Sequence, residues 1–127
     1  CFDIVGLMRI NDDISREAGD KVILESLKRI NSAAGEDMPV LRIGGDEFVM
    51  VTGLDDVEKV TKIAKAVMEK NGIETAYKGG TVPVSIRSGA VMIRKPLKYS
   101  MLCHDFDEVI SFARNDGEVH FAKAEQR

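Results

Sequence analysis

The sequence predicts an α/β protein of the α+β sandwich type, in which a central, mainly antiparallel sheet is flanked by helices. Segments with strand character alternate along the chain with segments of helical periodicity. Two apolar runs rich in β-branched residues are separated only by Gly44-Gly45-Asp46, which is typical of a β-hairpin. With 127 residues, 44% of them hydrophobic, the chain can bury one core without disulfides or a structural metal.

The first half of the chain predicts a strand, a helix and the hairpin. Phe2 to Gly6 has the composition of a short buried strand, and the polar stretch from Asn11 to Glu17 predicts a turn or an irregular entry into a helix. Apolar residues at helical spacing predict a helix from Ala18 to Ala33, which Gly35 ends. The hairpin strands are expected at Met38 to Ile43 and at Glu47 to Thr52.

The second half predicts two helices and further strands. Asp55 or Asp56 can cap a helix that ends at Asn71-Gly72. Val82 to Ile93 predicts either one strand with a bulge near Gly89 or two strands, and Pro83 favours an edge position. A last helix at about 107–115 and a strand at 119–122 complete the order, which by itself favours an antiparallel or mixed sheet with helices on one side.

Composition narrows the classes of protein. The net charge is −3 and the basic residues are spread through the helices, so no binding groove for a nucleic-acid polymer is expected. No apolar stretch approaches the ~20 residues of a membrane span, so we expect no direct membrane contact by this domain. Cys1 and Cys103 lack metal-ligand spacing and are expected to be free thiols in a reducing cytoplasm. Cys103-His104 is expected in a loop before the last helix.

Three acidic residues are candidates for a metal site. Asp46 and Glu47 follow the two glycines of the hairpin and, as neighbours on a strand, point to opposite faces. If the first strand pairs beside the hairpin, Asp3 comes close to Asp46, and the two carboxylates suit Mg²⁺ together with phosphate oxygens. An isolated Gly-Gly-Asp-Glu string is, in the alternative interpretation, a solvated turn.

Two motifs carry a family resemblance. Arg42-Ile43-Gly44-Gly45-Asp46-Glu47-Phe48 resembles the R-x-GGDEF signature of diguanylate cyclases. An upstream pattern of the same family is matched by Asp3, Ile10, Asn11, Asp12, Gly19 and Asp20, and Asp107 to Gly117 is similar to the last helix of the family. The resemblance covers nearly the whole chain, although the customary leading helix is absent. It implies a GGDEF, or nucleotidyl-cyclase-like, fold with the signature on the hairpin, and a single domain over residues 1–127 that is a fragment of a longer signalling protein.

The resemblance also implies a reaction and its residues. Two GTP molecules, each held by one protomer of a homodimer, condense to cyclic di-GMP and two pyrophosphates. By this resemblance Asp3, Ile4 and Asp46 hold Mg²⁺ or Mn²⁺, Glu47 acts on the metal or on the attacking hydroxyl, and Asp46 and Glu47 are the catalytic pair. The resemblance also implies the residues that bind the substrate. Asn11 and Asp20 read the guanine base, Gly44 and Gly45 leave room for the nucleotide, and Arg114 contacts it. The full-length protein is expected to carry a sensor or other signalling domain and a possible membrane anchor, with this domain in the cytoplasm.

Departures from the family pattern leave alternatives open. Leu7-Met8 replaces the Phe-Lys pair, Val5 replaces the second aspartate, and Glu118 reverses the charge that usually follows the last glycine. Arg9, Arg16 and Arg87 are candidates to compensate. The alternative function is a degenerate domain that binds GTP or a protein partner and regulates an attached module. Another nucleotidyl cyclase or a palm-like transferase is a third interpretation. Asn11 or Asp12 as a helix cap and Asp20 as a first-turn acid remain the plain structural interpretations.

Overall fold

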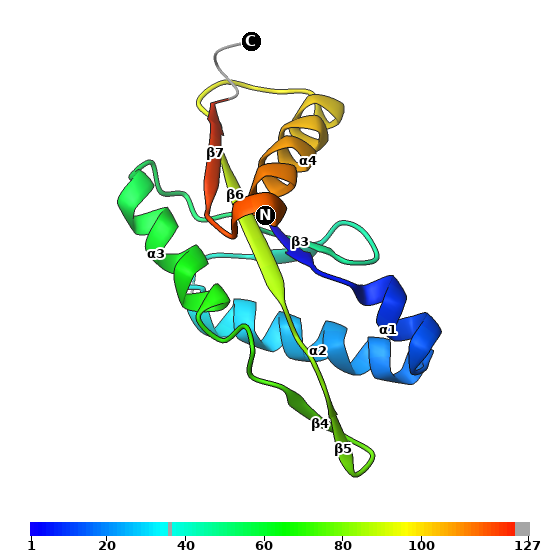
Figure 1. The fold of residues 1–127 in the computed structure, drawn as a ribbon. Helices are drawn as coiled ribbons and strands as arrows, with labels where there is room; N and C mark the ends of the chain where they lie inside the picture. The colour runs from blue at the N-terminus through cyan, green and yellow to red at the C-terminus, as the bar shows by residue number, and fades with distance from the viewer. Residues whose placement is uncertain (36, 124–127) are drawn as a thin grey trace.

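A computed structural model describes residues 1–35 and 37–123 (Figure 1). Along the chain the elements are β1 (Phe2–Ile4), α1 (Leu7–Asp13), α2 (Arg16–Ala33), β2 (Val40–Arg42), β3 (Glu47–Met50), α3 (Val57–Met68), β4 (Thr75–Tyr77), β5 (Gly80–Val82), β6 (Ile86–Met92), α4 (Tyr99–Asp116) and β7 (His120–Lys123). The hairpin of β2 and β3 and the helix α3, capped by Asp56, lie where the sequence predicts them.

The central sheet is mixed and mainly antiparallel. Its five strands have the order β2-β3-β1-β6-β7, and β4 pairs separately with β5. Every neighbour pair in the central sheet is antiparallel except β6 and β7, which run parallel. The central position of β1 places it between the signature hairpin and β6, so the first strand does pair beside the hairpin as predicted.

Helices cover both faces of this sheet, so the expectation of helices on one side is wrong. The core on one face combines residues of β1, β3 and β6 with residues of α2 and α3, namely Phe2, Ile4, Phe48, Ile86, Val22, Ile30, Ala64 and Val67. Because side chains alternate along a strand, Asp3 points to the opposite face, where Arg114 of α4 contacts it. The pattern of elements could not reveal this, since α4 returns across the sheet from far along the chain.

Gly89 allows α4 to pack closely on the sheet. A Cβ atom at this position of β6 would lie 2.4 Å from Cγ2 of Val109, a distance that real side chains do not reach. Val109 is itself buried. The glycine near the middle of the predicted 82–93 strand therefore marks a close approach of helix and strand rather than a bulge.

Four local features differ from the sequence prediction. The first is α1, a seven-residue helix, which is too short to show a periodic apolar pattern although Leu7 and Ile10 are buried. The second is α2, which begins at Arg16 because the Ser15 side chain accepts a hydrogen bond from the Ala18 amide. The third is α4, which begins at Tyr99, so Cys103-His104 lies in the helix and not in a loop.

The fourth feature is the hairpin of β4 and β5, which has no strong apolar alternation. Its turn contains Lys78 and Gly79, both with positive φ, as a tight hairpin turn requires. Val82 therefore ends one strand and Ile86 begins the next, which is the two-strand alternative. Pro83 lies in the connection, and β6 is an interior strand, so the edge position expected from Pro83 is wrong.

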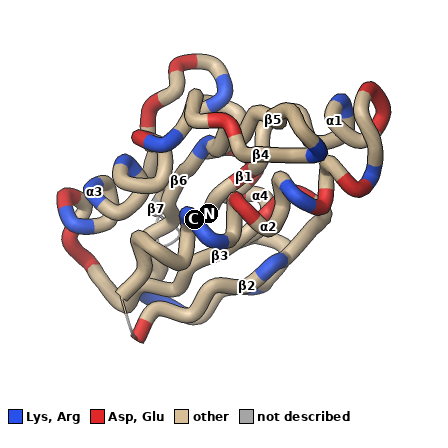
Figure 2. The backbone as a smooth tube through the Cα atoms, turned by 90° about the horizontal axis from the view of Figure 1, so that it is seen from below, with Lys and Arg blue, Asp and Glu red and all other residues tan. Residues whose placement is uncertain are grey.

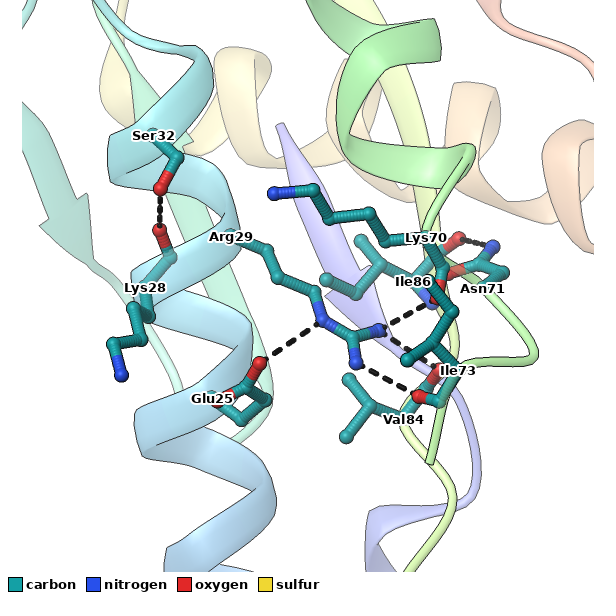
Figure 3. A network of polar contacts seen from close by, with 9 residues as sticks. All are labelled: Glu25, Lys28, Arg29, Ser32, Lys70, Asn71, Ile73, Val84 and Ile86. Atoms are coloured by element: carbon teal, nitrogen blue, oxygen red, sulfur yellow. Dashed lines mark hydrogen bonds and ion pairs between the residues drawn. The ribbon is translucent and has the colours of Figure 1, made fainter. Parts of the chain in front are cut away.

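Arg29 joins α2 to the segment that enters the second half of the fold (Figure 3). Its buried guanidinium donates to the carbonyl oxygens of Lys70 at 2.9 Å, Ile73 at 2.8 Å and Val84 at 3.4 Å. Glu25, one helical turn earlier on α2, accepts from Arg29 Nε at 3.3 Å. This network uses all three guanidinium nitrogens and fixes the connections on either side of the β4–β5 hairpin.

Candidate active site

Pairing of β1 with β3 brings three carboxylates together at one place on the sheet. Asp3 and Glu47 are direct partners in the antiparallel register, and Asp46 immediately precedes β3. The Ile4 amide donates a 2.9 Å hydrogen bond to the Asp46 carbonyl oxygen, which fixes the start of β3 against β1. One carboxylate oxygen from each of Asp3, Asp46 and Glu47 lies within 4.8 Å of the other two.

The environment of this cluster disfavours negative charge. Burial raises the pKa of Asp3 above its ordinary value, although the hydrogen bond from Arg114 acts in the opposite direction. The pKa of Glu47 is also raised, first by burial and then by the negative charges of Asp3, Asp107 and Asp46. A cation placed among these carboxylates would relieve both effects.

A protein cation already compensates part of this charge. Arg114 on α4 donates to Asp3 Oδ2 from Nε at 3.0 Å and also from Nη2. The Asp3 hydrogen bond and its charge raise the pKa of Arg114, so this guanidinium stays protonated. About half of the Arg114 side chain is exposed. The side chain can therefore leave Asp3 for a ligand without first being uncovered.

The donor set fits a hard divalent cation. Carboxylate oxygens are the ligands that Mg²⁺ and Mn²⁺ prefer, and these three converge without any nitrogen or sulfur donor. The side chain of Ile4 is a hydrocarbon buried in the core, and its main-chain carbonyl oxygen is the atom of this residue that can serve as a ligand. The predicted metal residues Asp3 and Asp46 are thus brought together, and Glu47 joins them.

The turn between β2 and β3 is held by Arg42. Its Nε donates to the Gly44 carbonyl oxygen at 3.1 Å and its Nη2 to that of Gly45 at 2.7 Å. Both glycines are exposed, neither has positive φ, and a Cβ on Gly45 would meet nothing within 4 Å. The space beside Gly45 is therefore open to a ligand, whereas a Cβ on Gly44 would contact the Glu47 side chain at 3.7 Å. The role of Arg42 in shaping the turn is one that sequence analysis missed.

A pocket of about 340 Å³ opens beside the carboxylates. Its lining runs from the end of β1 into the first residues of α1 and includes one residue each of the hairpin turn, β6 and α4: Ile4, Val5, Gly6, Leu7, Met8, Asp46, Arg87 and Arg114. A second hollow, also about 340 Å³, is lined by the acids of β1 and β3 and by residues of α4: Asp3, Glu47, Asp107, Ile110, Ser111, Arg114 and Asn115. Arg114 borders both. Glu118 is exposed and lines neither.

Asn11 and Asp20 occupy the adjoining helices α1 and α2. A Cβ atom on Gly19 would lie 1.7 Å from Oδ1 of Asn11, so the Asn11 amide rests in a notch that only glycine provides. Asp20 is exposed one residue further along α2. The structure shows that Asn11 and the residue before Asp20 touch, but neither Asn11 nor Asp20 lines the pocket beside the acids.

Charge and hydrophobicity elsewhere are unremarkable. Figure 2 shows lysines and arginines interspersed with acidic residues along the described trace, not gathered on one element. An apolar groove of about 370 Å³ between α3, α4 and the ends of β3 and β6 contains none of the predicted site residues. Within residues 1–35 and 37–123, no helix has the length and hydrophobicity that crossing a bilayer requires.

Comparison with known families identifies the chain. The family described as "Diguanylate cyclase, GGDEF domain" matches residues 1–120. The chain therefore belongs to the GGDEF domain family, as the two sequence motifs indicate.

Solved structures agree on the fold. The GGDEF domain of YfiN, also called TpbB, from Pseudomonas aeruginosa is 26% identical, with a TM-score of 0.75 over 95% of this chain and 78% of that one. The GGDEF domain of DgcB from Caulobacter crescentus, solved in complex with c-di-GMP, is 19% identical, with a TM-score of 0.76 over 98% and 75% of the two chains. The active GGEEF domain of a diguanylate cyclase from Vibrio cholerae is 17% identical, with a TM-score of 0.72 over 99% of this chain and 81% of that one. The predicted GGDEF fold is confirmed.

Among curated proteins, an uncharacterized membrane protein of Staphylococcus aureus strain USA300 is 26% identical over 120 residues. The match covers 91% of this chain and 34% of the staphylococcal protein. The chain thus spans about a third of the length of the curated relatives it matches.

Proposed function

We propose that this domain is a diguanylate cyclase that condenses two GTP molecules to cyclic di-GMP. The observation that carries the proposal is the convergence of Asp3, Asp46 and Glu47 beside a pocket that two arginines line. In each of two steps the 3′-hydroxyl oxygen of one GTP forms a bond to the α-phosphorus of the other. The bond from that phosphorus to the bridging oxygen breaks, pyrophosphate leaves, and the hydroxyl proton passes to a base.

Asp3, the main chain of Ile4 and Asp46 are the proposed holders of Mg²⁺ or Mn²⁺. A bound divalent ion would neutralise phosphate charge and lower the pKa of a coordinated hydroxyl. Glu47 acts on that ion or accepts the proton of the 3′-hydroxyl. In the metal-free domain burial and neighbouring acids raise the pKa of Glu47, and a bound ion would lower it again, so Glu47 would be charged beside the metal.

The nucleotide is proposed to lie from the carboxylates towards α1 and α2. Asn11, whose amide can donate and accept, and Asp20, which accepts from ring and exocyclic N–H groups, would distinguish guanine from adenine. Gly45 leaves its side of the hairpin turn open, and Gly44 is proposed to accommodate the nucleotide beside Glu47. Arg114 contacts the phosphates after it leaves Asp3.

Catalysis is proposed to need a homodimer, since one protomer offers one set of acids and the reaction needs two nucleotides face to face. The rest of the full-length protein is proposed to supply a sensor or other signalling domain, with this domain in the cytoplasm. The staphylococcal relative is described as a membrane protein, which supports an anchor outside the matched region.

One observation favours a second candidate, a domain that binds nucleotide or a protein partner and regulates an attached module. Leu7 and Met8 line the pocket where the family pattern has a lysine, so the phosphates meet less positive charge. With Arg114 engaged by Asp3, weak triphosphate binding is the expected defect.

Incubation of the domain at high concentration with GTP and Mg²⁺, followed by chromatography, tests the two candidates. We expect cyclic di-GMP from the wild type and none from Asp46→Ala or Glu47→Ala. Glu108→Gln is the matched control, because this exposed acid of α4 lines neither pocket. Wild type that binds GTP without forming product supports the regulatory domain, whereas normal product from Glu47→Ala refutes the role of Glu47.

A further inference from the structure

Arg87 is a cation at the candidate site to which neither the motifs nor the proposed function assigns a role. It lies on β6 directly opposite Asp3 of β1 in the antiparallel register. Directly opposed residues project from the same face of a sheet, so Arg87 lies on the face that carries the acids and α4. Its side chain is partly buried and lines the pocket together with Asp46 and Arg114.

The two arginines of the pocket differ in their partners. Arg114 is engaged by the Asp3 carboxylate. The only hydrogen bond of the Arg87 side chain among the described residues is a 3.3 Å contact to the carbonyl oxygen of Ile86, and no carboxylate in that part of the chain pairs with it. A partly buried guanidinium without a carboxylate partner retains most of its donors for an anionic ligand.

Much of the remaining pocket lining is the segment from Ile4 to Met8, which supplies apolar side chains and main chain but no cation. The family pattern places a lysine at the position of Met8, so a cation that takes the place of this lysine comes from another element. The sequence offers Arg9, Arg16 and Arg87 as substitutes for the missing lysine. Arg9 and Arg16 are exposed and line neither pocket, so Arg87 is the one of the three that lies at the site.

We infer that Arg87 binds the phosphate chain of a nucleoside triphosphate, in place of the lysine absent at Met8. A guanidinium offers paired donors that match phosphate oxygens, and Asp46 on the same pocket would hold the metal that shares those oxygens. The inference rests on the proposed function for the identity of the nucleotide, but the anion site itself follows from the pocket and its cations. Arg87 then binds the phosphates from β6, and Arg114 binds them from α4.

Isothermal titration of the domain with GTP, with magnesium pyrophosphate and with Mn²⁺ alone tests this assignment. Arg87→Gln is expected to weaken binding of GTP and of pyrophosphate by about 10–100-fold, the usual effect of losing a charge-assisted hydrogen bond. Mn²⁺ binding should not weaken, because Arg87 neither coordinates the metal nor pairs with the carboxylates that would hold it. Arg87→Lys should recover part of the loss. The control Arg9→Gln, at an exposed position of α1, should bind as the wild type does.

Pyrophosphate separates this inference from the proposed function. If the wild type forms no cyclic di-GMP but its pyrophosphate affinity falls in Arg87→Gln, the phosphate site stands and the cyclase proposal fails. If cyclic di-GMP forms but Arg87→Gln and Arg87→Lys bind GTP and pyrophosphate within about twofold of the wild type, the assignment of Arg87 is overturned. Wild type that binds neither GTP nor pyrophosphate overturns it as well. Circular dichroism of each variant establishes that it is folded.

Discussion

The carboxylates of Asp3 and Glu47 oppose folding when they are charged and no metal is bound. Both have a pKa raised by burial, so the folded state binds their protons more tightly than the unfolded state does. Stability from this source is complete below the ordinary pKa values of 3.8 and 4.5 and is lost as the pH rises through the raised values. The metal-free domain therefore carries this cost at neutral pH.

Glu47→Gln removes one of these charges and should stabilise the metal-free domain at neutral pH. We expect a rise of about 2–4 °C in the midpoint of thermal unfolding, with the difference from wild type shrinking as the pH falls through the pKa of Glu47. Added Mg²⁺ should favour the wild type more than the variant. Scanning calorimetry from acid to neutral pH, with Glu108→Gln as control, measures both effects. A constant difference across the pH range contradicts the assigned shift.

Gly19 determines where the Asn11 amide lies. Since a Cβ at Gly19 would lie 1.7 Å from Asn11 Oδ1, Gly19→Ala must move the amide. If Asn11 reads guanine, the preference for GTP over ATP should fall about tenfold, the loss of one well-placed hydrogen bond. Mn²⁺ binding should be unchanged, because the acids lie on other elements.

Competition titrations with GTP and ATP measure this preference. The variant Asn11→Ala supplies the comparison, since adding Gly19→Ala to it should reduce the preference no further. Gly19→Ala that keeps the full preference while Asn11 is intact would show that the notch does not position a base-reading group.

At the scale of the elements, Arg29 carries the connection between the halves of the fold. Arg29→Met would leave the carbonyl oxygens of Lys70, Ile73 and Val84 without this donor, and we expect a loss of about 2–4 kcal/mol in the free energy of unfolding. Urea unfolding measures it. Lys28→Met, a neighbouring change that leaves these carbonyl oxygens paired, should cost less than about 0.5 kcal/mol. A loss below about 1 kcal/mol for Arg29→Met would mean that water replaces the guanidinium.

Elements with strong local signals could be predicted from the sequence. The signature hairpin has apolar runs on both sides of two glycines, and α3 combines an Asp56 cap with a clear apolar face. By contrast, α1 has too few residues for a period to show, and the β4–β5 hairpin depends on a turn through Lys78 and Gly79. The early start of α4 at Tyr99 and the placement of α4 on the second face of the sheet depend on tertiary packing, which local patterns do not report.

The candidate site was predictable where it follows the motif and not where distant segments meet. Asp3, Asp46 and Glu47 come together as the pairing of β1 with β3 requires. The proximity of Arg87 to the acids depends on β6 lying next to β1, and Asp107 acts on the cluster from α4. Neither relation has a signature in the local sequence, because more than eighty residues separate Asp3 from Arg87.

At the scale of the whole molecule, the candidate site is open on one protomer. Gly44 and Gly45 are exposed, and Arg114 is about half exposed. Phosphoryl transfer to a hydroxyl competes with transfer to water unless the site is covered. In the proposed reaction a second protomer covers the site and brings the second GTP, so activity per protomer should rise with protein concentration until the dimer saturates.

Mixing active and inactive protomers distinguishes this dimer mechanism from catalysis by single protomers. Asp46→Ala protomers, added to the wild type at fixed total concentration, should form mixed dimers in which one nucleotide lacks its metal. Because product needs two intact half-sites, the rate of cyclic di-GMP formation should follow the square of the wild-type fraction, so an equal mixture retains about a quarter of the rate. Addition of Glu108→Gln protomers should leave the rate unchanged. A rate that falls in simple proportion to the wild-type fraction would mean that each protomer acts alone.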